Sequence, residues 1–178
     1  MLWHRLHVGS ALLLAISTLF VLGPGLMLAS AQSSPGEASV MVAIDLRTAE
    51  TTAEPDAEHQ LLAMLNSVRS QRGLPPLRMD RSLQQVARAH SHEMVTGGYV
   101  GHGSKNGESA IDRLSHVVVH GLVGENVTFA VNCAAANRAL VASKGHLANI
   151  LEPRFHRVGI GIFSAGTMGL AVTQDFAE

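Results

Sequence analysis

The stretch Val158-Gly159-Ile160-Gly161-Ile162-Phe163 near the carboxyl end alternates glycine with apolar residues. Residues 165–167 (Ala-Gly-Thr) can form a turn, and the segment from Met168 to Phe176 is again rich in apolar residues. This succession predicts a β-hairpin. The alternating glycines also indicate that another backbone approaches the first strand closely, because side chains there would hold it away.

Helical signals precede the hairpin. A first helix is expected from Ala57, where Asp56 can cap the start, to Gly73, which can close the end. A second helix is expected after Asp80 and ends at Gly97-Gly98. Its apolar face is predicted to carry Leu83, Val86, Ala87, His90 and Met94.

Three shorter helices and one further strand complete the expected elements. The helices cover residues 109–118, 132–144 and 146–151, and residues 124–129 can supply a third strand. The residues from Leu74 to Leu77 must be extended, because the two prolines among them disfavour the helical region. Helices followed by a small antiparallel sheet predict an α+β domain.

The amino-terminal residues have the pattern of an export signal. Arg5 precedes an apolar stretch from Val8 to Leu28, and Ala29-Ser30-Ala31 supplies the small residues that signal peptidase requires. We expect residues 1–31 to be a signal peptide cleaved before Gln32, and an uncleaved membrane anchor is the alternative. Either outcome places the domain outside the cytosol, as a secreted or extracytoplasmic protein of the cell envelope.

The remaining chain is expected to consist of a flexible linker over residues 32–56 and one folded domain over residues 57–178. Residues Val40 to Ile44 of the linker could form a short strand. Without residues 1–31 the chain has 12 basic and 14 acidic side chains, and its basic residues are scattered. This composition argues against a nucleic-acid partner.

Cys133 is the single cysteine, so no intramolecular disulfide can form. We expect it to be a small apolar residue inside a helix.

Eight histidines follow residue 31, and their contexts differ. His59 and His156 have charged neighbours and are expected at the surface, whereas His90 is expected to be a hydrogen-bonded core residue. His92 should point elsewhere on the same helix.

Three further residues each lie beside glycine: His102, Glu125 and His146. Two imidazoles and one carboxylate suit a divalent transition ion, and glycine leaves room for a ligand to approach. The alternative is that the histidines only support neighbouring groups or cap helices, and that local amides stabilise the Glu125 carboxylate. The pattern by itself leaves both possibilities open.

The order of these residues along the chain resembles a known family. The resemblance rests on Ala89-His90, Tyr99 with His102, Arg113, Gly124-Glu125-Asn126, the segment from Ser143 to Leu151, Val158-Gly159-Ile160-Gly161 and Thr173-Gln174-Asp175-Phe176. Together they resemble the bacterial branch of the CAP superfamily, also called SCP or the cysteine-rich secretory, antigen 5 and pathogenesis-related 1 group. The resemblance covers about Glu58 to Ala177.

The resemblance implies a three-layer α-β-α sandwich with a small antiparallel sheet between helical layers and a central cleft. It places His102, Glu125 and His146 on the cleft positions and implies zinc or another divalent cation there. Two departures stand out. Residues 137–144 contain no second acidic residue, and Lys144 replaces the usual proline, which would put a cation beside His146 if it turned inward.

Three functions compete. The first is an exported binding module for a small ligand, lipid, cell-envelope component or protein partner, with the cleft as a metal-organised or empty pocket. The resemblance favours it most, and the chain lacks a Gly-x-Ser-x-Gly nucleophile motif. The second, ranked behind it, is a metal-dependent hydrolase with Glu125 as ligand or general base. The third is a structural envelope protein in which the cluster braces the fold. An uncleaved signal would provide the membrane contact.

Overall fold

The computed structural model describes residues 52–178. The predicted signal peptide, its cleavage point and the possible strand from Val40 to Ile44 lie outside the described residues. Within residues 52–178, no helix is both long and apolar enough to cross a membrane.

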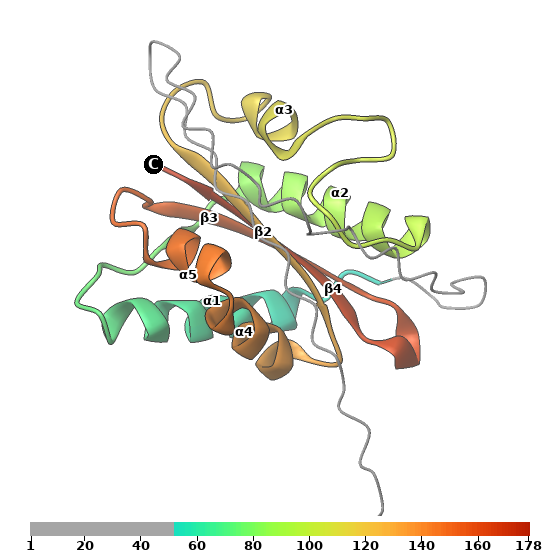
Figure 1. The fold of residues 1–178 in the computed structure, drawn as a ribbon, viewed down its shortest axis with the longest axis horizontal. Coiled ribbons are helices and arrows are strands. Elements are labelled where there is room, and N and C mark those ends of the chain that lie inside the picture. The colour runs from blue at the N-terminus through green and yellow to red at the C-terminus, as the bar shows by residue number, and fades with distance from the viewer. Residues whose placement is uncertain (1–51) are drawn as a thin grey trace, which may run out of the picture.

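The chain forms helices on both faces of a four-stranded sheet, as Figure 1 shows. In chain order the elements are α1 (Pro55–Ser70), β1 (Arg78–Met79), α2 (Arg81–Gly97), α3 (Ala110–Ser115), β2 (Val123–Ala130), α4 (Cys133–Ala142), α5 (Lys144–Leu151), β3 (Arg157–Ser164), a short 3-10 turn η1 (Gly166–Met168) and β4 (Leu170–Ala177). The sheet order is β1-β3-β4-β2. Helices α2 and α3 lie on one side and α1, α4 and α5 on the other (Figure 1). The predicted three-layer α-β-α sandwich is confirmed.

The sheet is mixed rather than wholly antiparallel. β4 pairs antiparallel with β2 and β3, which confirms the predicted hairpin and third strand. β1 is an addition that the sequence did not indicate, and it pairs parallel with the start of β3. Two residues of extended backbone after the prolines are too short for a periodic signal.

The folded part begins ahead of the expected boundary at residue 57. The backbone N–H of Glu54 donates to the carbonyl of Ile162, and that of Ser164 donates to Thr52. Helix α1 then starts at Pro55, which suits a first helical position because its missing N–H has no partner to lose there. Residues 52–56 of the predicted linker therefore belong to the fold, and Asp56 lies in the first turn rather than capping it.

The capping predictions for the other long helix are confirmed. The Asp80 side chain accepts hydrogen bonds from the backbone N–H groups of Ser82 and Leu83 at the start of α2. Gly98 ends the helix in the left-handed conformation, at φ 68°. Ser109 and Asn132 cap α3 and α4 in the same way as Asp80 caps α2.

Helix α2 rests directly on β3 at two glycines. A Cβ built on Gly161 would lie 2.2 Å from the carbonyl carbon of Ala87, and one built on Gly159 would lie 2.1 Å from that of Leu83. The Ser91 hydroxyl lies 2.8 Å from both the Gly161 carbonyl oxygen and Thr173 Oγ1 in the same contact. The predicted close approach is confirmed. It fixes the distance between α2 and the sheet, and with it the position of the loop that follows α2.

The opposite layer holds the larger hydrophobic cluster, and one arginine is buried within this layer. Residues of α1, α4, α5 and the sheet contribute, among them Leu61, Leu140, Ile150 and Ile160. Cys133 is buried beside them, as expected. Arg69 at the end of α1 is fully buried and donates hydrogen bonds only to backbone carbonyls.

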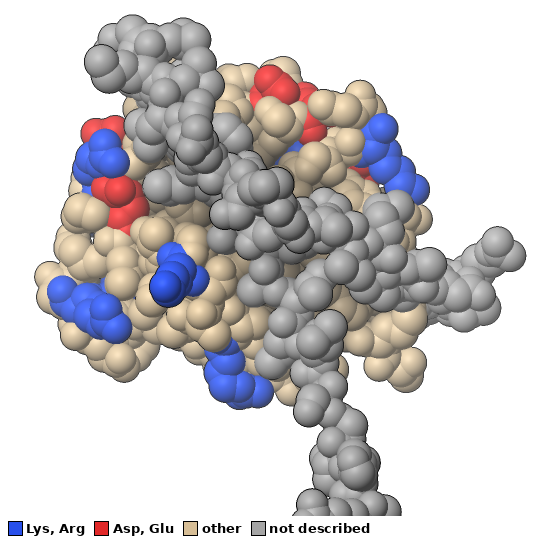
Figure 2. Space-filling model, viewed as in Figure 1, with Lys and Arg blue, Asp and Glu red and all other residues tan. Residues whose placement is uncertain are grey.

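On the face shown in Figure 2, Lys and Arg side chains stand apart from one another.

Candidate functional site

Glu125 on β2 is the centre of a buried polar cluster at the edge of the sheet. His102 Nδ1 lies 2.8 Å from Glu125 Oε1, and Arg113 Nη2 donates to Glu125 Oε2 at 2.6 Å. The carboxylate is 3% exposed, so both of its oxygens are held by protein donors rather than by water. His102 and Glu125, two of the three residues that the sequence offered as candidate metal ligands, therefore lie in direct contact.

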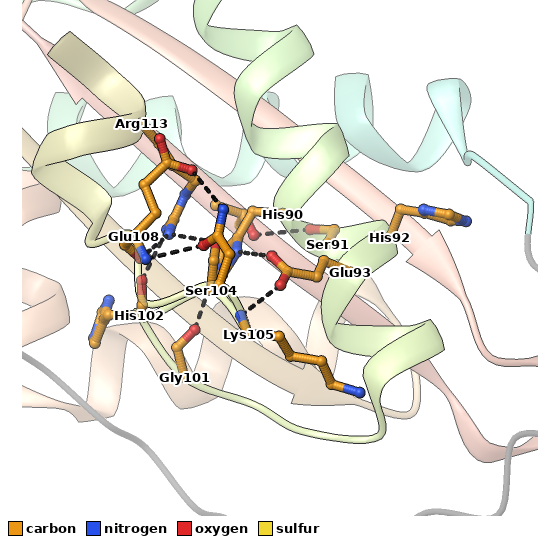
Figure 3. Close-up of polar contacts among 12 residues, drawn as sticks. His90, Ser91, His92, Glu93, Gly101, His102, Ser104, Lys105, Glu108 and Arg113 are labelled. Atoms are coloured by element: carbon orange, nitrogen blue, oxygen red, sulfur yellow. Dashed lines mark hydrogen bonds and ion pairs between the residues drawn. The ribbon is translucent and has the colours of Figure 1, made fainter. Parts of the chain in front are cut away.

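Arg113 on α3 ties the His102 loop to β2. Besides Glu125, its guanidinium donates to the Ser104 hydroxyl and to the carbonyls of His102 and Glu108. Figure 3 shows these groups gathered beside the part of α2 that carries His90 and Glu93. One side chain therefore sets the position of the loop, of α3 and of the carboxylate together.

His90 supports the same loop from below. Its Nε2 atom lies 2.8 Å from the carbonyl oxygen of Gly101, the residue before His102, and the side chain is buried. Burial lowers the pKa of His90, so the ring is neutral and Nε2 donates. The predictions of a hydrogen-bonded core role for His90 and a different direction for His92, which points away in Figure 3, are confirmed.

Asp175 supplies a second buried carboxyl group. It faces Glu125 in the register of β2 and β4 and is fully buried, and neither of its carboxyl oxygens has a hydrogen-bond partner. Burial, and then the negative charge of Glu125, raise the pKa of Asp175 well above its ordinary value. For Glu125 itself burial opposes ionisation, but the hydrogen bond from His102 and the positive charge of Arg113 hold its pKa below the usual value. The two pKa values are therefore displaced in opposite directions, that of Glu125 toward the ionised form and that of Asp175 toward the neutral form.

His146 lies near the start of α5 and is also fully buried. The Asn126 side chain donates to its backbone carbonyl, which fixes the helix start against β2. Both ring nitrogens lack a hydrogen-bond partner. Burial, and then the charge of His102, lower the pKa of His146 to about 4, so the imidazole is neutral.

Two features of the site differ from the sequence-based picture. Lys144 is exposed, so it does not turn inward toward His146, and the cation at the cluster is Arg113. The missing second acidic residue is not supplied by residues 137–144, but Asp175 of β4 brings a carboxyl group to Glu125. The sequence placed neither Arg113 nor Asp175 at the site, and their presence in the family resemblance was the only signal for them.

A pocket opens beside the cluster, between α3 and β2. Its volume is about 300 Å³. Apolar side chains of Ala110, Ile111, Leu114 and Val123 form its sides, and His102 and Glu125 form its polar end. The arrangement combines an apolar chamber with a small number of fixed polar groups, which is typical of small-molecule sites.

The residues as they lie do not fit a three-ligand metal centre. Glu125 gives its two oxygens to His102 and Arg113, and a guanidinium beside the carboxylate opposes a further cation. Within residues 52–178 no group of three or more His, Cys, Asp or Glu side chains is arranged to hold a metal ion. The atoms that remain available as metal ligands are two imidazole nitrogens, His102 Nε2 and one nitrogen of His146. Metal binding stays a prediction.

Replacing His146 with leucine should remove an acid sensitivity. The folded-state pKa of about 4 lies below the value of about 6.5 for a free imidazole, so the unfolded chain binds the proton first as the pH falls. We expect the wild type to lose about 2 kcal/mol of unfolding free energy relative to His146→Leu between pH 7 and pH 5. Urea denaturation at both pH values measures this difference.

Asp175 changes the unfolding free energy in the opposite direction, because its raised pKa favours the folded state as the pH falls. This contribution is the same in the wild type and in His146→Leu, so it cancels when the two are compared. A difference between the two proteins that does not change with pH would contradict a buried neutral His146.

The sandwich with a His-Glu-Arg cluster at its sheet edge defines an SCP-type domain. A model of the CAP family, the cysteine-rich secretory protein family, matches residues 62–176, and the chain belongs to this family. It is 31% identical over 136 residues to the uncharacterized protein YkwD of Bacillus subtilis, covering 73% of this chain and 52% of that protein. It is 33% identical over 109 residues to the uncharacterized membrane protein YlbC of the same organism, covering 60% of this chain and 31% of that one.

Solved structures agree with the fold. An extracellular protein containing an SCP domain from Bacillus anthracis superimposes with a TM-score of 0.61 at 30% identity, over 70% of this chain and 41% of that one. An outer surface protein of Borrelia burgdorferi superimposes with a TM-score of 0.67 at 14% identity, over 73% of this chain and 98% of that one, which shows the fold alone. The chain spans about half the length of YkwD and less of YlbC.

Proposed function

We propose that the chain is an exported binding module that holds a small apolar ligand, such as a lipid fragment, in the pocket between α3 and β2. The observation that carries this proposal is the apolar chamber of about 300 Å³ with His102 and Glu125 at one end. Burying an apolar ligand in such a chamber is favourable at roughly 25 cal/mol for each Å² removed from water.

The polar cluster favours a binding function over a hydrolytic one. A general base needs an oxygen free to take a proton from water, and both oxygens of Glu125 already accept hydrogen bonds from Arg113 and His102. The same contacts make the cluster rigid, because Arg113 fixes the loop and α3 together. A rigid wall lowers the cost of ordering the pocket when a ligand binds.

Filling the pocket should weaken ligand binding. Ile111 forms one side of it, so Ile111→Trp is expected to weaken the binding of 1-octanol and of 1-methoxyheptane about 10-fold or more. Isothermal titration calorimetry measures both affinities. Val119→Trp is the matched control, because Val119 is 83% exposed, lies outside the pocket and should leave binding unchanged.

Two results would contradict the proposal: neither probe binding saturably, or Ile111→Trp binding both as well as the wild type.

Export is the second part of the proposal. It is supported by the signal-like residues 1–31 and by the 30% identity to a Bacillus anthracis protein that is described as extracellular. Expression of the full chain in a bacterial host should yield envelope or medium protein whose first residue is Gln32. Amino-terminal sequencing of that protein checks the prediction. Retention of Met1 in membrane-bound protein would favour the uncleaved anchor instead.

A further inference from the structure

Three buried amide side chains lie on the α5 face of the sheet, opposite to α3. Asn126 on β2, Asn149 on α5 and Gln174 on β4 are each at most 1% exposed. The register pairs Asn126 directly with Gln174, and α5 packs against β2. Burying an amide is unfavourable unless it makes hydrogen bonds, so the bonds of these three side chains indicate what they hold in place.

Hydrogen bonds to backbone carbonyls fix the orientation of the two asparagines. The Glu125 carbonyl oxygen can only accept, so the Asn149 atom that lies 3.1 Å from it is the nitrogen Nδ2. The same Nδ2 donates to Asn126 Oδ1 at 2.9 Å. Asn126 Nδ2 therefore faces the other way, where it donates to the His146 carbonyl and to Gln174 Oε1, each at 3.1 Å. The three amides form one chain of hydrogen bonds.

This chain of hydrogen bonds ends at the edge of the sheet. β2 is an edge strand in the order β1-β3-β4-β2. The Glu178 N–H donates to the Leu122 carbonyl, and hydrogen bonding alternates along an antiparallel pair, so the Glu125 carbonyl faces away from β4. Asn149 supplies the donor that a neighbouring strand would supply to an inner strand.

The segment that Asn149 holds is a wall of the pocket. Val123, Gly124 and Glu125 line the pocket, whereas none of the three amide side chains does. A Cβ built on Gly124 would lie 3.1 Å from Asn149 Oδ1, so Asn149 also contacts the wall one residue earlier. An ordered wall lowers the free-energy cost of binding, because less of the pocket has to be fixed when the ligand enters.

We infer that Asn149 is a positioning residue for the pocket. It holds the β2 wall in its binding geometry through the Glu125 carbonyl, and Gln174 supports it through Asn126. The inference rests on the proposed function, because it concerns the same pocket. None of the three amides touches the ligand, and each acts through the group to which it is hydrogen-bonded.

Removing the Asn149 amide should weaken ligand binding. Asn149→Leu keeps a side chain of similar size but cannot donate to the Glu125 carbonyl, so the affinities for 1-octanol and 1-methoxyheptane should fall about 5-fold or more. Titration calorimetry of the full chain measures both affinities. Ile150→Ala is the matched control, because Ile150 is the next residue of α5, is fully buried and does not line the pocket. It should lower stability but change the affinities by less than about twofold.

A second variant tests the chain of hydrogen bonds. Gln174→Met removes the acceptor for Asn126 and should weaken binding about threefold, less than Asn149→Leu, because Asn126 keeps its bond to the His146 carbonyl. Since Gln174 acts through Asn149, the double variant should bind the probes within about twofold of Asn149→Leu alone. Effects that multiply in the double variant would show that the two residues act separately, and would overturn the inference.

The wild type supplies a measurement that needs no substitution. Saturation with 1-octanol should shift the side-chain amide resonances of Asn149, because the wall that the ligand contacts is hydrogen-bonded to this amide. The side-chain amide resonances of Asn132, which caps α4, should stay in place. A ¹H–¹⁵N correlation spectrum of the full chain records both.

The outcomes separate the inference from the proposed function. If neither probe binds the wild type saturably, the proposed function fails and the inference fails with it. If Asn149→Leu binds as tightly as a binding-competent wild type, or Ile150→Ala loses as much affinity as Asn149→Leu, the positioning role is wrong while the binding function stands. Asn149 resonances that do not respond to bound 1-octanol also overturn the inference.

Discussion

Gly161→Ala is expected to unfold the protein or to lower its unfolding free energy by more than about 4 kcal/mol. The added methyl carbon would lie 2.2 Å from both the carbonyl carbon of Ala87 and the backbone nitrogen of Arg88. These atoms belong to the backbone of α2, so no rotation of a side chain relieves the collision. The whole helix would have to move away from β3, and the Ser91 hydrogen bond to the Gly161 carbonyl would be lost with it.

Gly101→Ala is the matched control, because a Cβ there meets no atom within 4 Å and its φ is not positive. We expect it to leave stability unchanged or to raise it by up to about 1 kcal/mol. Urea denaturation followed by far-ultraviolet circular dichroism compares both variants with the wild type. If the unfolding free energy of Gly161→Ala lay within about 1 kcal/mol of the wild-type value, the effect would be close to that of an ordinary surface change. That result would show that the backbone of α2 does not contact β3 at Gly161.

Arg69→Met is expected to lower the unfolding free energy by about 3 to 5 kcal/mol. The fully buried guanidinium donates to four carbonyl oxygens, those of Pro75, Ile150, Glu152 and Phe155. It thereby joins the end of α1 to the end of α5 and to the turn that leads into β3. Methionine preserves the apolar stem but leaves all four acceptors without this donor.

Two variants sharpen the test of Arg69. Arg72→Met removes an exposed arginine three residues away and should change the unfolding free energy by less than about 0.5 kcal/mol. Arg69→Lys keeps the charge, but a single ammonium cannot reproduce the fork geometry of the guanidinium, so it should restore only part of the loss. An Arg69→Met protein as stable as the wild type would mean that water satisfies the four carbonyls.

Local signals in the sequence predicted most of the secondary structure. Asp80, Gly98, Ser109 and Asn132 act on backbone groups within a few residues, so their capping roles follow from their immediate neighbours. The start of α1 and the strand β1 were not predicted, because both depend on pairing with β3 far along the chain. Pairing partners at that separation leave no local pattern.

The candidate site was predictable in part. His102 and Glu125 were singled out by their glycine neighbours, and the fold brings them to 2.8 Å. Arg113 and Asp175 were not singled out, because a charged residue in a short helix or in a strand is ordinarily solvated. Their burial becomes visible only when α3 covers the edge of β2 and when β4 pairs with β2.

The sequence alone therefore determined the caps of α2, α3 and α4, the hairpin, the close glycine contact and the family, since each depends on the order and spacing of nearby residues. Only the tertiary structure decided the chemistry of the site. It placed the guanidinium of Arg113 against Glu125 and left Lys144 in solvent, and it buried Asp175 beside the same carboxylate. Charge, tautomer and protonation depend on distances of a few ångströms between residues far apart in the chain, because electrostatic and hydrogen-bond energies fall steeply with distance and solvent exposure.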